Sequence, residues 1–257
     1  MAPSERWVRR AATQGRFSTF TVLRNKKKIS CYSIVPAGSS SADSQNPIVL
    51  LSHPISRKAK YFFSETERSL AYLRKGLTVF AFDYNGFGES ESIDLYYWRD
   101  VVAVLDALKG QFPGRRIILH GASFGAFHII RALEHLPFGS TVILENVNKS
   151  LISYWRRWPL TAFLVRLLML TRVRSIREMD VRSIVKNFAR PDLHIHFIAC
   201  EKDDFTTLDE MRDLYHDLAT VNKSFTVFDG AGHLAAPSKD PLLYQSALFV
   251  EVRDYAQ

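Results

Sequence analysis

One serine stands between two glycines in the stretch Gly121-Ala122-Ser123-Phe124-Gly125, near the middle of the 257-residue chain. An apolar run, "RRIILH", precedes it and a helical pattern, "FGAFHIIRALEHL", follows it, so we expect Ser123 where a strand becomes a helix. The flanking glycines permit a turn too tight for larger side chains, and the positive end of the following helix then faces the hydroxyl. Such a turn is either an ordinary connection or the position of a nucleophile, and this context favours the nucleophile.

A serine hydroxyl needs a general base, and His233 is the histidine best placed to be one. It lies in a loop of small residues, "DGAGHLAAP", directly after the last expected strand, where an imidazole is free to reach another strand end. Most of the other seven histidines fall within expected strands and helices, where a packing role is the simpler interpretation. We therefore predict that His233 takes the proton from Ser123.

The imidazole in turn needs an acid that orients it, and the segment "IHFIACEKDDFT" supplies Asp203 and Asp204. Both follow an expected strand directly. A charged pair in that position is often only a solvated turn, and these residues alone do not decide between the two carboxylates. The sequence therefore gives two candidates for the acid of a Ser, Asp and His set.

The composition limits the class of protein. With 47% hydrophobic and 23% charged residues, the chain is long enough to bury a full core as one large domain. Its two cysteines, Cys31 and Cys200, do not make a disulfide framework. Neither a secretory segment nor an apolar run of membrane-spanning length is visible, so we expect a cytoplasmic protein.

Apolar periodicity predicts an alternation of strands and helices. The expected strands begin with an antiparallel pair and continue as buried runs, at 17–24, 27–36, 46–53, 77–83, 115–120, 141–146, 193–200 and 223–229. The expected helices are at 64–76, 96–110, 124–136, 207–219 and 241–256. Strands joined by helical crossovers predict a three-layer α/β sandwich around a largely parallel sheet.

Taken together, these motifs resemble the α/β-hydrolase superfamily over essentially the whole chain, and most closely its lipase, esterase and serine-aminopeptidase-like branch. The turn "DYNGFGES", residues 83–90, is similar to that branch's Asp-x-Arg-Gly-x-Gly-x-Ser turn, with Asn85 in place of the arginine. The resemblance implies a hydrolase sandwich with a roughly eight-stranded sheet. It also implies a first core part at 1–148, a helical cap at 149–190 and a second core part at 191–257.

The family resemblance also implies roles for individual residues. Its chain order of serine, acid and histidine, and a family-like spacing from the preceding strand end, favour Asp203 over Asp204 as the acid. The segment "LLSHPIS" matches the family's His-Gly oxyanion-hole motif, but Pro54 replaces the glycine and has no N–H to donate. The implied oxyanion donors are therefore the backbone N–H groups of Ile55 and Phe124.

The expected cap is unusually basic. Residues 149–190 contain ten basic and two acidic residues, a net charge of +8 that equals that of the whole chain. The simpler interpretation is a helical cap whose arginines are solvated. The sharper hypothesis is recognition of an anionic head group or a membrane surface. For that role the candidate substrate-binding residues are Trp155, Arg156, Arg157 and Trp158. Nucleic-acid binding is the weakest alternative, because no recognition motif accompanies the charge.

The sequence therefore predicts a serine hydrolase of carboxylesterase, thioesterase or lipase-like type, acting on a small-molecule acyl ester or thioester through an acyl-serine intermediate. We expect neither a metal nor an organic cofactor. Two alternatives stay open. The same triad can serve an acyltransferase, in which an alcohol or amine accepts the acyl group, and the same fold can serve a non-catalytic ligand-binding receptor.

Overall fold

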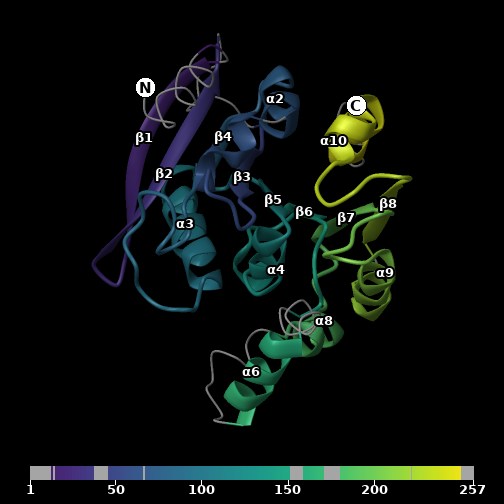
Figure 1. The fold of residues 1–257 in the computed structure, drawn as a ribbon. Helices are drawn as coiled ribbons and strands as arrows, with labels where there is room; N and C mark the ends of the chain where they lie inside the picture. Colours follow the sequence, from purple (N-terminus) through teal and green to yellow (C-terminus); the bar gives the residue numbers. More distant parts are fainter. Residues whose placement is uncertain are drawn as a thin grey trace.

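The centre of the molecule is an eight-stranded sheet in the order β1-β2-β4-β3-β5-β6-β7-β8 (Figure 1). The computed structural model describes residue 13 and residues 15–37, 46–65, 67–150, 159–170, 180–220 and 222–249. The strands are β1 (Gly15–Arg24), β2 (Lys27–Pro36), β3 (Ile48–Ser52), β4 (Val79–Phe82), β5 (Ile117–Ala122), β6 (Thr141–Glu145), β7 (His194–Cys200) and β8 (Lys223–Phe228). Among them only β2 runs against the others, because it pairs antiparallel with both β1 and β4 while all later pairs are parallel. The predicted largely parallel sheet is confirmed.

The hairpin at the start of the sheet turns over two residues. Arg24 pairs with Lys27, and the residues between them, Asn25 and Lys26, have φ values of 52° and 62°. Positive φ at both central residues matches the twist of the flanking strands, and this is why such turns dominate two-residue hairpins. The antiparallel pair predicted from the alternating pattern is therefore present.

Helices cover both faces of the sheet and complete the predicted three layers (Figure 1). The α-helices are α2 (Glu67–Arg74), α3 (Trp98–Gln111), α4 (Phe124–Ile130), α6 (Pro159–Leu170), α8 (Arg182–Asn187), α9 (Leu208–Asp217), α10 (Ala236–Lys239) and α11 (Pro241–Leu248). Apolar side chains of α3, α4 and α9 share one core with Leu50 of β3, whereas those of α2, α10 and α11 share the other core with Val49 and Leu51. Alternate residues of one strand thus enter opposite cores.

Two predicted helices are shorter than expected. The helix predicted over 64–76 begins at Glu67, because the 3-10 helix η1 (Ala59–Glu65) occupies the residues before it. The helix predicted over 124–136 ends at Ile130 and is followed by the short 3-10 helix η2 (Leu133–His135). The chain tightens there just before Pro137, which cannot continue a helix.

The insertion between β6 and β7 contains α6 and α8 in its described part. In Figure 1 these two helices lie next to each other, below α4 and away from the sheet. Residues 151–158 and 171–179 of the insertion lie outside the described residues. Nowhere in the described ranges is a helix both long and apolar enough to cross a membrane.

Candidate active site

Ser123 occupies a strained turn between β5 and α4. Its φ of 53° and ψ of −113° lie where L-residues are rarely found. A hydrogen bond of 2.8 Å from its backbone N–H to the carbonyl oxygen of Glu145 on β6 holds this conformation. Strain of this kind persists only where the surrounding structure imposes it, and it is common at sites of chemistry.

The two glycines around Ser123 are required by close backbone packing. A Cβ atom at Gly121 would lie 2.6 Å from the backbone nitrogen of Ala126, and one at Gly125 would lie 2.0 Å from the carbonyl oxygen of Ser52. Both distances are far below van der Waals contact. The glycines therefore let β5 meet α4, and α4 meet β3, closely enough to form the turn that carries Ser123.

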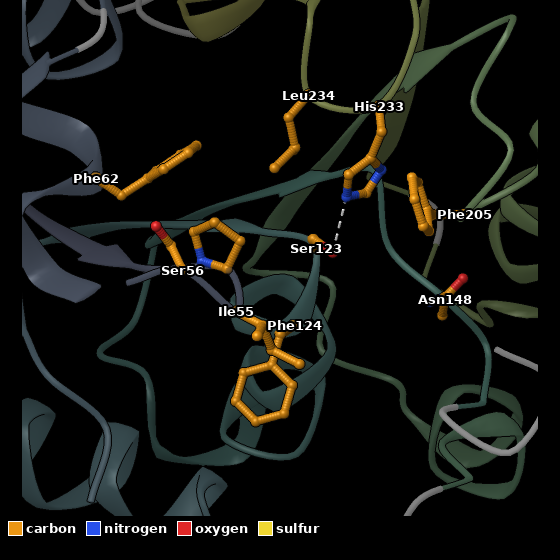
Figure 2. A pocket seen from close by; sticks show the side chains of 10 residues that line it. Ile55, Ser56, Phe62, Ser123, Phe124, Asn148, Phe205, His233 and Leu234 are labelled. Atoms are coloured by element: carbon orange, nitrogen blue, oxygen red, sulfur yellow. Dashed lines mark hydrogen bonds between the residues drawn. The ribbon is translucent and has the colours of Figure 1, made fainter. Parts of the chain in front are cut away.

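Ser123, His233 and Asp203 form one chain of hydrogen bonds. The Oγ of Ser123 lies 3.2 Å from Nε2 of His233, and Nδ1 of His233 lies 2.7 Å from Oδ2 of Asp203. Figure 2 shows the imidazole reaching down from its loop after β8 toward Ser123. The Asp203 carboxylate accepts a hydrogen bond from the N–H at Nδ1. The unprotonated Nε2 therefore directs its lone pair at the serine hydroxyl.

Asp203 is held by several donors besides the imidazole. Its Oδ1 accepts from the backbone N–H groups of Phe205 and Thr206 at 2.7 and 3.0 Å, and its Oδ2 also accepts from Asn146 Nδ2 at 2.6 Å. Burial alone would raise the pKa of this carboxyl, but the hydrogen bonds and the charge of His233 lower it below its usual value. Asp204, the alternative acid, is exposed to solvent, and the structure therefore brings Asp203 to His233.

The two expected oxyanion donors border the same pocket as Ser123. Phe124 is the first residue of α4, where a helix leaves its N–H groups without an internal partner. Ile55 follows Pro54, whose carbonyl oxygen accepts a 2.7 Å hydrogen bond from Nδ1 of buried His53. Since a C=O and the next N–H point in opposite directions across a trans peptide, His53 fixes the direction of the Ile55 N–H.

His53 is itself fixed by a second contact. Its Nε2 accepts a 3.2 Å hydrogen bond from the backbone N–H of Tyr84. The ring proton is therefore on Nδ1, which donates to the carbonyl oxygen of Pro54. Burial lowers the pKa of this imidazole and keeps it neutral. Pro54, which replaces the glycine of the family's His-Gly motif, has no N–H to donate. The next residue, Ile55, still offers a backbone N–H whose direction is fixed.

The pocket beside Ser123 has a volume of about 330 Å³. Its wall is formed by Pro54, Ile55, Ser56, Phe62, Ser123, Phe124, Asn148, Phe205, His233 and Leu234. None of these side chains carries a charge, apart from His233 when it is protonated. The ring of Phe205 lies against the imidazole, with their centroids 5.1 Å apart. Such a site suits a small, mostly apolar and uncharged ligand.

A buried ion pair adjoins the strand that holds the Ser123 turn. Arg68 on α2 contacts Glu145 on β6 through both ends of the carboxylate, with Nε 2.8 Å from Oε2. His120 and Tyr244 also reach the Glu145 carboxylate, at 3.3 and 3.0 Å. Burial opposes ionisation of Glu145, but the charge of Arg68 and the hydrogen bonds from His120 and Arg68 outweigh it and lower the pKa of Glu145 to about 2. Sequence reasoning missed this cluster.

The remaining predicted residues are placed as follows. Trp155, Arg156, Arg157 and Trp158, the expected substrate-binding residues of the cap, lie outside the described residues. Cys31 and Cys200 are both free and buried. In the described part of the chain, no group of three or more His, Cys, Asp or Glu side chains is arranged to hold a metal ion.

Comparison with known proteins identifies the family. A model of the alpha/beta hydrolase family matches residues 49–186, more than half of the chain. No curated protein matches the sequence. An esterase of Pyrococcus furiosus has a similar structure, with a TM-score of 0.72 at 18% identity over 93% of this chain and 90% of that one.

Two further solved structures extend the comparison. A serine hydrolase without a lid from Xanthomonas campestris superposes with a TM-score of 0.64 at 16% identity, over 93% of this chain and 95% of that one. An acylaminoacyl peptidase in complex with a chloromethyl ketone gives a TM-score of 0.70 at 16% identity, over 94% of this chain and 41% of that one. At such identities the likeness concerns the fold, which agrees with the matched family model. The chain belongs to the alpha/beta hydrolase family.

Proposed function

We propose that the protein is a serine esterase that hydrolyses small, uncharged carboxylic esters or thioesters through an acyl-serine intermediate. The observation that carries this proposal is the hydrogen-bonded chain from Asp203 through His233 to Ser123. That chain ends at the wall of a pocket that also borders the backbone of Ile55 and Phe124. A nucleophile, a base, an orienting acid and two donors for an oxyanion are thus together in one site.

The first half of the reaction forms the acyl-enzyme. Nε2 of His233 takes the proton of Ser123 as Oγ attacks the substrate carbonyl, and Asp203 stabilises the imidazolium that results. The carbonyl oxygen becomes an oxyanion that accepts from the N–H groups of Ile55 and Phe124; one such donor typically contributes about 100- to 1,000-fold in rate. The imidazolium then gives its proton to the departing alcohol or thiol, and the acyl group stays on Ser123.

The second half returns the enzyme to its starting state. Water enters where the leaving group was, and His233 takes a proton from it as the oxygen attacks the acyl carbonyl. The same two N–H groups stabilise the second tetrahedral intermediate. When this collapses, the proton goes to Ser123 Oγ and the carboxylic acid leaves. An acyltransferase would differ only in the acceptor that takes the place of water.

The pocket supports a short and uncharged substrate. Its volume of about 330 Å³ is at the small end of the usual range for ligand sites, and Phe62, Phe124 and Phe205 contribute much of its wall. Esterases and serine hydrolases are among the similar structures, and this agrees with an ester as the substrate. The described wall contains no lysine or arginine that would attract an anionic head group.

We further propose that residues 149–190 form a helical cap between the two core parts, 1–148 and 191–257. Its place in the chain, between β6 and β7, and its two described helices, α6 and α8, support this division. Asn148, which directly precedes the segment, lies in the pocket wall. The proposed cap therefore begins next to the site.

The direct test is turnover of p-nitrophenyl esters with acyl chains of two to twelve carbons. The wild-type protein should cleave the short chains with the highest kcat/KM, because longer chains exceed the pocket. Ser123→Ala and His233→Ala should each lower kcat by three or more orders of magnitude while leaving the far-UV circular dichroism unchanged. Near-wild-type turnover by either variant would exclude the proposed mechanism, and matching acyl thioesters would rank the two leaving groups.

A further inference from the structure

Asn148 is a buried polar residue in the pocket wall whose side-chain oxygen has no hydrogen-bonding partner among the described residues. It lies three residues beyond the end of β6 and is 5% exposed. Its Oδ1 is fully buried, and no residue in the described part of the chain donates a hydrogen bond to it. Figure 2 shows Asn148 on the same side of the pocket as Phe205 and His233.

Among the described residues of this wall, only Asn148 has a buried polar atom without a partner. Ser56 Oγ accepts from the backbone N–H of Lys58 at 3.1 Å, and Ser123 and His233 pair with each other. A buried acceptor left without a donor costs roughly 1–3 kcal/mol, so native structures rarely retain one without a reason. One such reason is a ligand that enters the pocket and supplies the missing hydrogen bond to the Asn148 side chain.

The nearby Asn146 makes a useful contrast with Asn148. Its Nδ2 donates to Asp203 at 2.6 Å, and its Oδ1 accepts from the thiol of Cys200 at 3.4 Å. Both ends of that amide are thus occupied by the protein and hold the catalytic acid. The amide of Asn148, two residues later in the chain, lines the pocket instead and has an unfilled acceptor.

The position of Asn148 indicates which part of the substrate it meets. In the proposed reaction His233 protonates the leaving group, so the leaving group must lie on the His233 side of Ser123. Phe205 packs against His233 on that side, with their ring centroids 5.1 Å apart, and Asn148 lies on the same side of the pocket (Figure 2). Phe62 lies across the pocket from them, where an apolar acyl chain would fit.

The chemistry of an amide indicates the group that completes it. An asparagine offers one acceptor and one donor end, and a half-turn of the side chain exchanges them. A hydroxyl both donates and accepts through one atom, so it satisfies whichever end faces the pocket. We propose that Asn148 hydrogen-bonds a hydroxyl on the alcohol portion of the substrate, and that the substrate class is a short-chain ester of a diol or polyol.

This inference rests on the proposed esterase activity and is tested with two substrates that differ in one group. In 2-hydroxyethyl butanoate a hydroxyl stands where n-propyl butanoate has a methyl group, and both give the same butanoyl-enzyme. The ratio of their kcat/KM values is measured for the wild-type protein and for Asn148→Leu, which keeps a branched side chain and removes the amide. The wild-type ratio should exceed that of the variant roughly tenfold, the effect of one unpaired buried acceptor.

Two further variants keep the comparison interpretable. Ser56→Ala removes another polar group of the same wall, but one that the protein already pairs, and should leave the ratio unchanged. Asn148→Ala replaces Asn148→Leu in the comparison if leucine prevents folding, and it should also lower the ratio of the two kcat/KM values. Equal ratios in the wild-type protein and the Asn148 variants would overturn the inference, since a water molecule would then satisfy the amide.

Failure of the inference and failure of the proposed function give different results. The wild-type protein could cleave both esters with a ratio of kcat/KM values that the Asn148 variants do not change. That result would support the esterase activity and contradict the proposed contact between Asn148 and the hydroxyl. If neither ester is cleaved and Ser123 does not react with an acylating reagent, both proposals fall together.

Discussion

The guanidinium of Arg68 donates a 2.9 Å hydrogen bond to the carbonyl oxygen of Leu234, the residue that follows His233. The same guanidinium forms a buried ion pair with Glu145, whose backbone carbonyl accepts the N–H of Ser123 at 2.8 Å. One side chain therefore connects the loop of the proposed base with the strand that holds the proposed nucleophile. We infer that Arg68 is a positioning residue for both.

Removal of Arg68 should affect catalysis and stability separately. Arg68→Met should lower the free energy of unfolding by about 3–5 kcal/mol, because it leaves the Glu145 carboxylate buried without its partner. The double variant Arg68→Met/Glu145→Gln should regain most of that loss, since no buried charge remains. Its kcat should still fall roughly tenfold with little change in KM, because the Leu234 carbonyl has lost its donor. Full recovery of kcat in the double variant would mean that the pair serves stability alone.

The buried pair also predicts how stability depends on pH. The pKa of Glu145 is about 2 in the folded protein, below the ordinary value of 4.5 for a glutamate. A depressed carboxyl pKa contributes stability above the unfolded value and loses it as pH falls toward the folded value. The free energy of unfolding should thus decline between about pH 4.5 and pH 2, by up to 1.4 kcal/mol per pH unit for this one group.

Urea unfolding at a series of pH values tests this directly. The Arg68→Met/Glu145→Gln variant has lost the titrating carboxyl. Its free energy of unfolding should therefore fall less steeply over the same pH window, by the slope that corresponds to uptake of up to one proton on unfolding. The carboxyl of Asp203 stays present in both proteins and keeps some acid dependence, because its pKa is also lowered. Identical slopes in the two proteins would show that Glu145 does not titrate as stated.

The tight turn makes Gly125 sensitive to a single methyl group. A Cβ atom there would lie 2.0 Å from the carbonyl oxygen of Ser52, so Gly125→Ala should cost about 1–3 kcal/mol of stability and displace Ser123. Gly110, within α3, is the matched control, because a Cβ atom there would meet nothing within 4 Å beyond its own helix backbone and chain neighbours. Gly110→Ala should stabilise the protein by about 0.5–1 kcal/mol in thermal or urea unfolding. A tolerated Gly125→Ala would contradict the packing described.

Asp203 and Asp204 form a natural pair for comparison. Asp203→Asn should lower kcat by roughly four orders of magnitude, because an amide no longer holds the His233 tautomer that accepts the serine proton. Asp204→Asn should leave kcat within about twofold, since that carboxylate is exposed to solvent. Steady-state ester hydrolysis measures both. A large loss in Asp204→Asn together with an active Asp203→Asn would reverse the assignment.

Much of the fold was predictable because its signals are local. Continuous apolar runs marked the parallel strands, alternation marked the front hairpin, and the context of Ser123 and His233 selected them among many serines and histidines. The choice between Asp203 and Asp204 needed the backbone of one turn. The N–H groups of Phe205 and Thr206 direct the Asp203 carboxylate toward His233, and no sequence pattern shows that direction.

The residues behind the site were not predictable in the same way. Arg68 and Glu145 are separated by 77 positions in sequence, and neither belongs to a recognised motif. One signal was present: Glu145 ends the otherwise apolar strand "TVILE", and a carboxylate in a buried strand requires a cation nearby. That signal predicts the existence of a partner but does not identify Arg68. Asn148 had no signal at all, because its significance is an unpaired atom in a pocket that only the folded chain forms.

The proposed nucleophile can be tested most directly by covalent labelling with a fluorophosphonate, followed by intact-protein and peptide mass spectrometry. The reagent requires an activated serine, so the wild-type protein should gain one adduct, and the adduct should map to Ser123. Ser123→Ala should gain none, and His233→Ala should react at least a hundredfold more slowly. Absence of labelling in a folded wild-type protein, or an adduct on another serine, would contradict the assignment of Ser123 as the nucleophile.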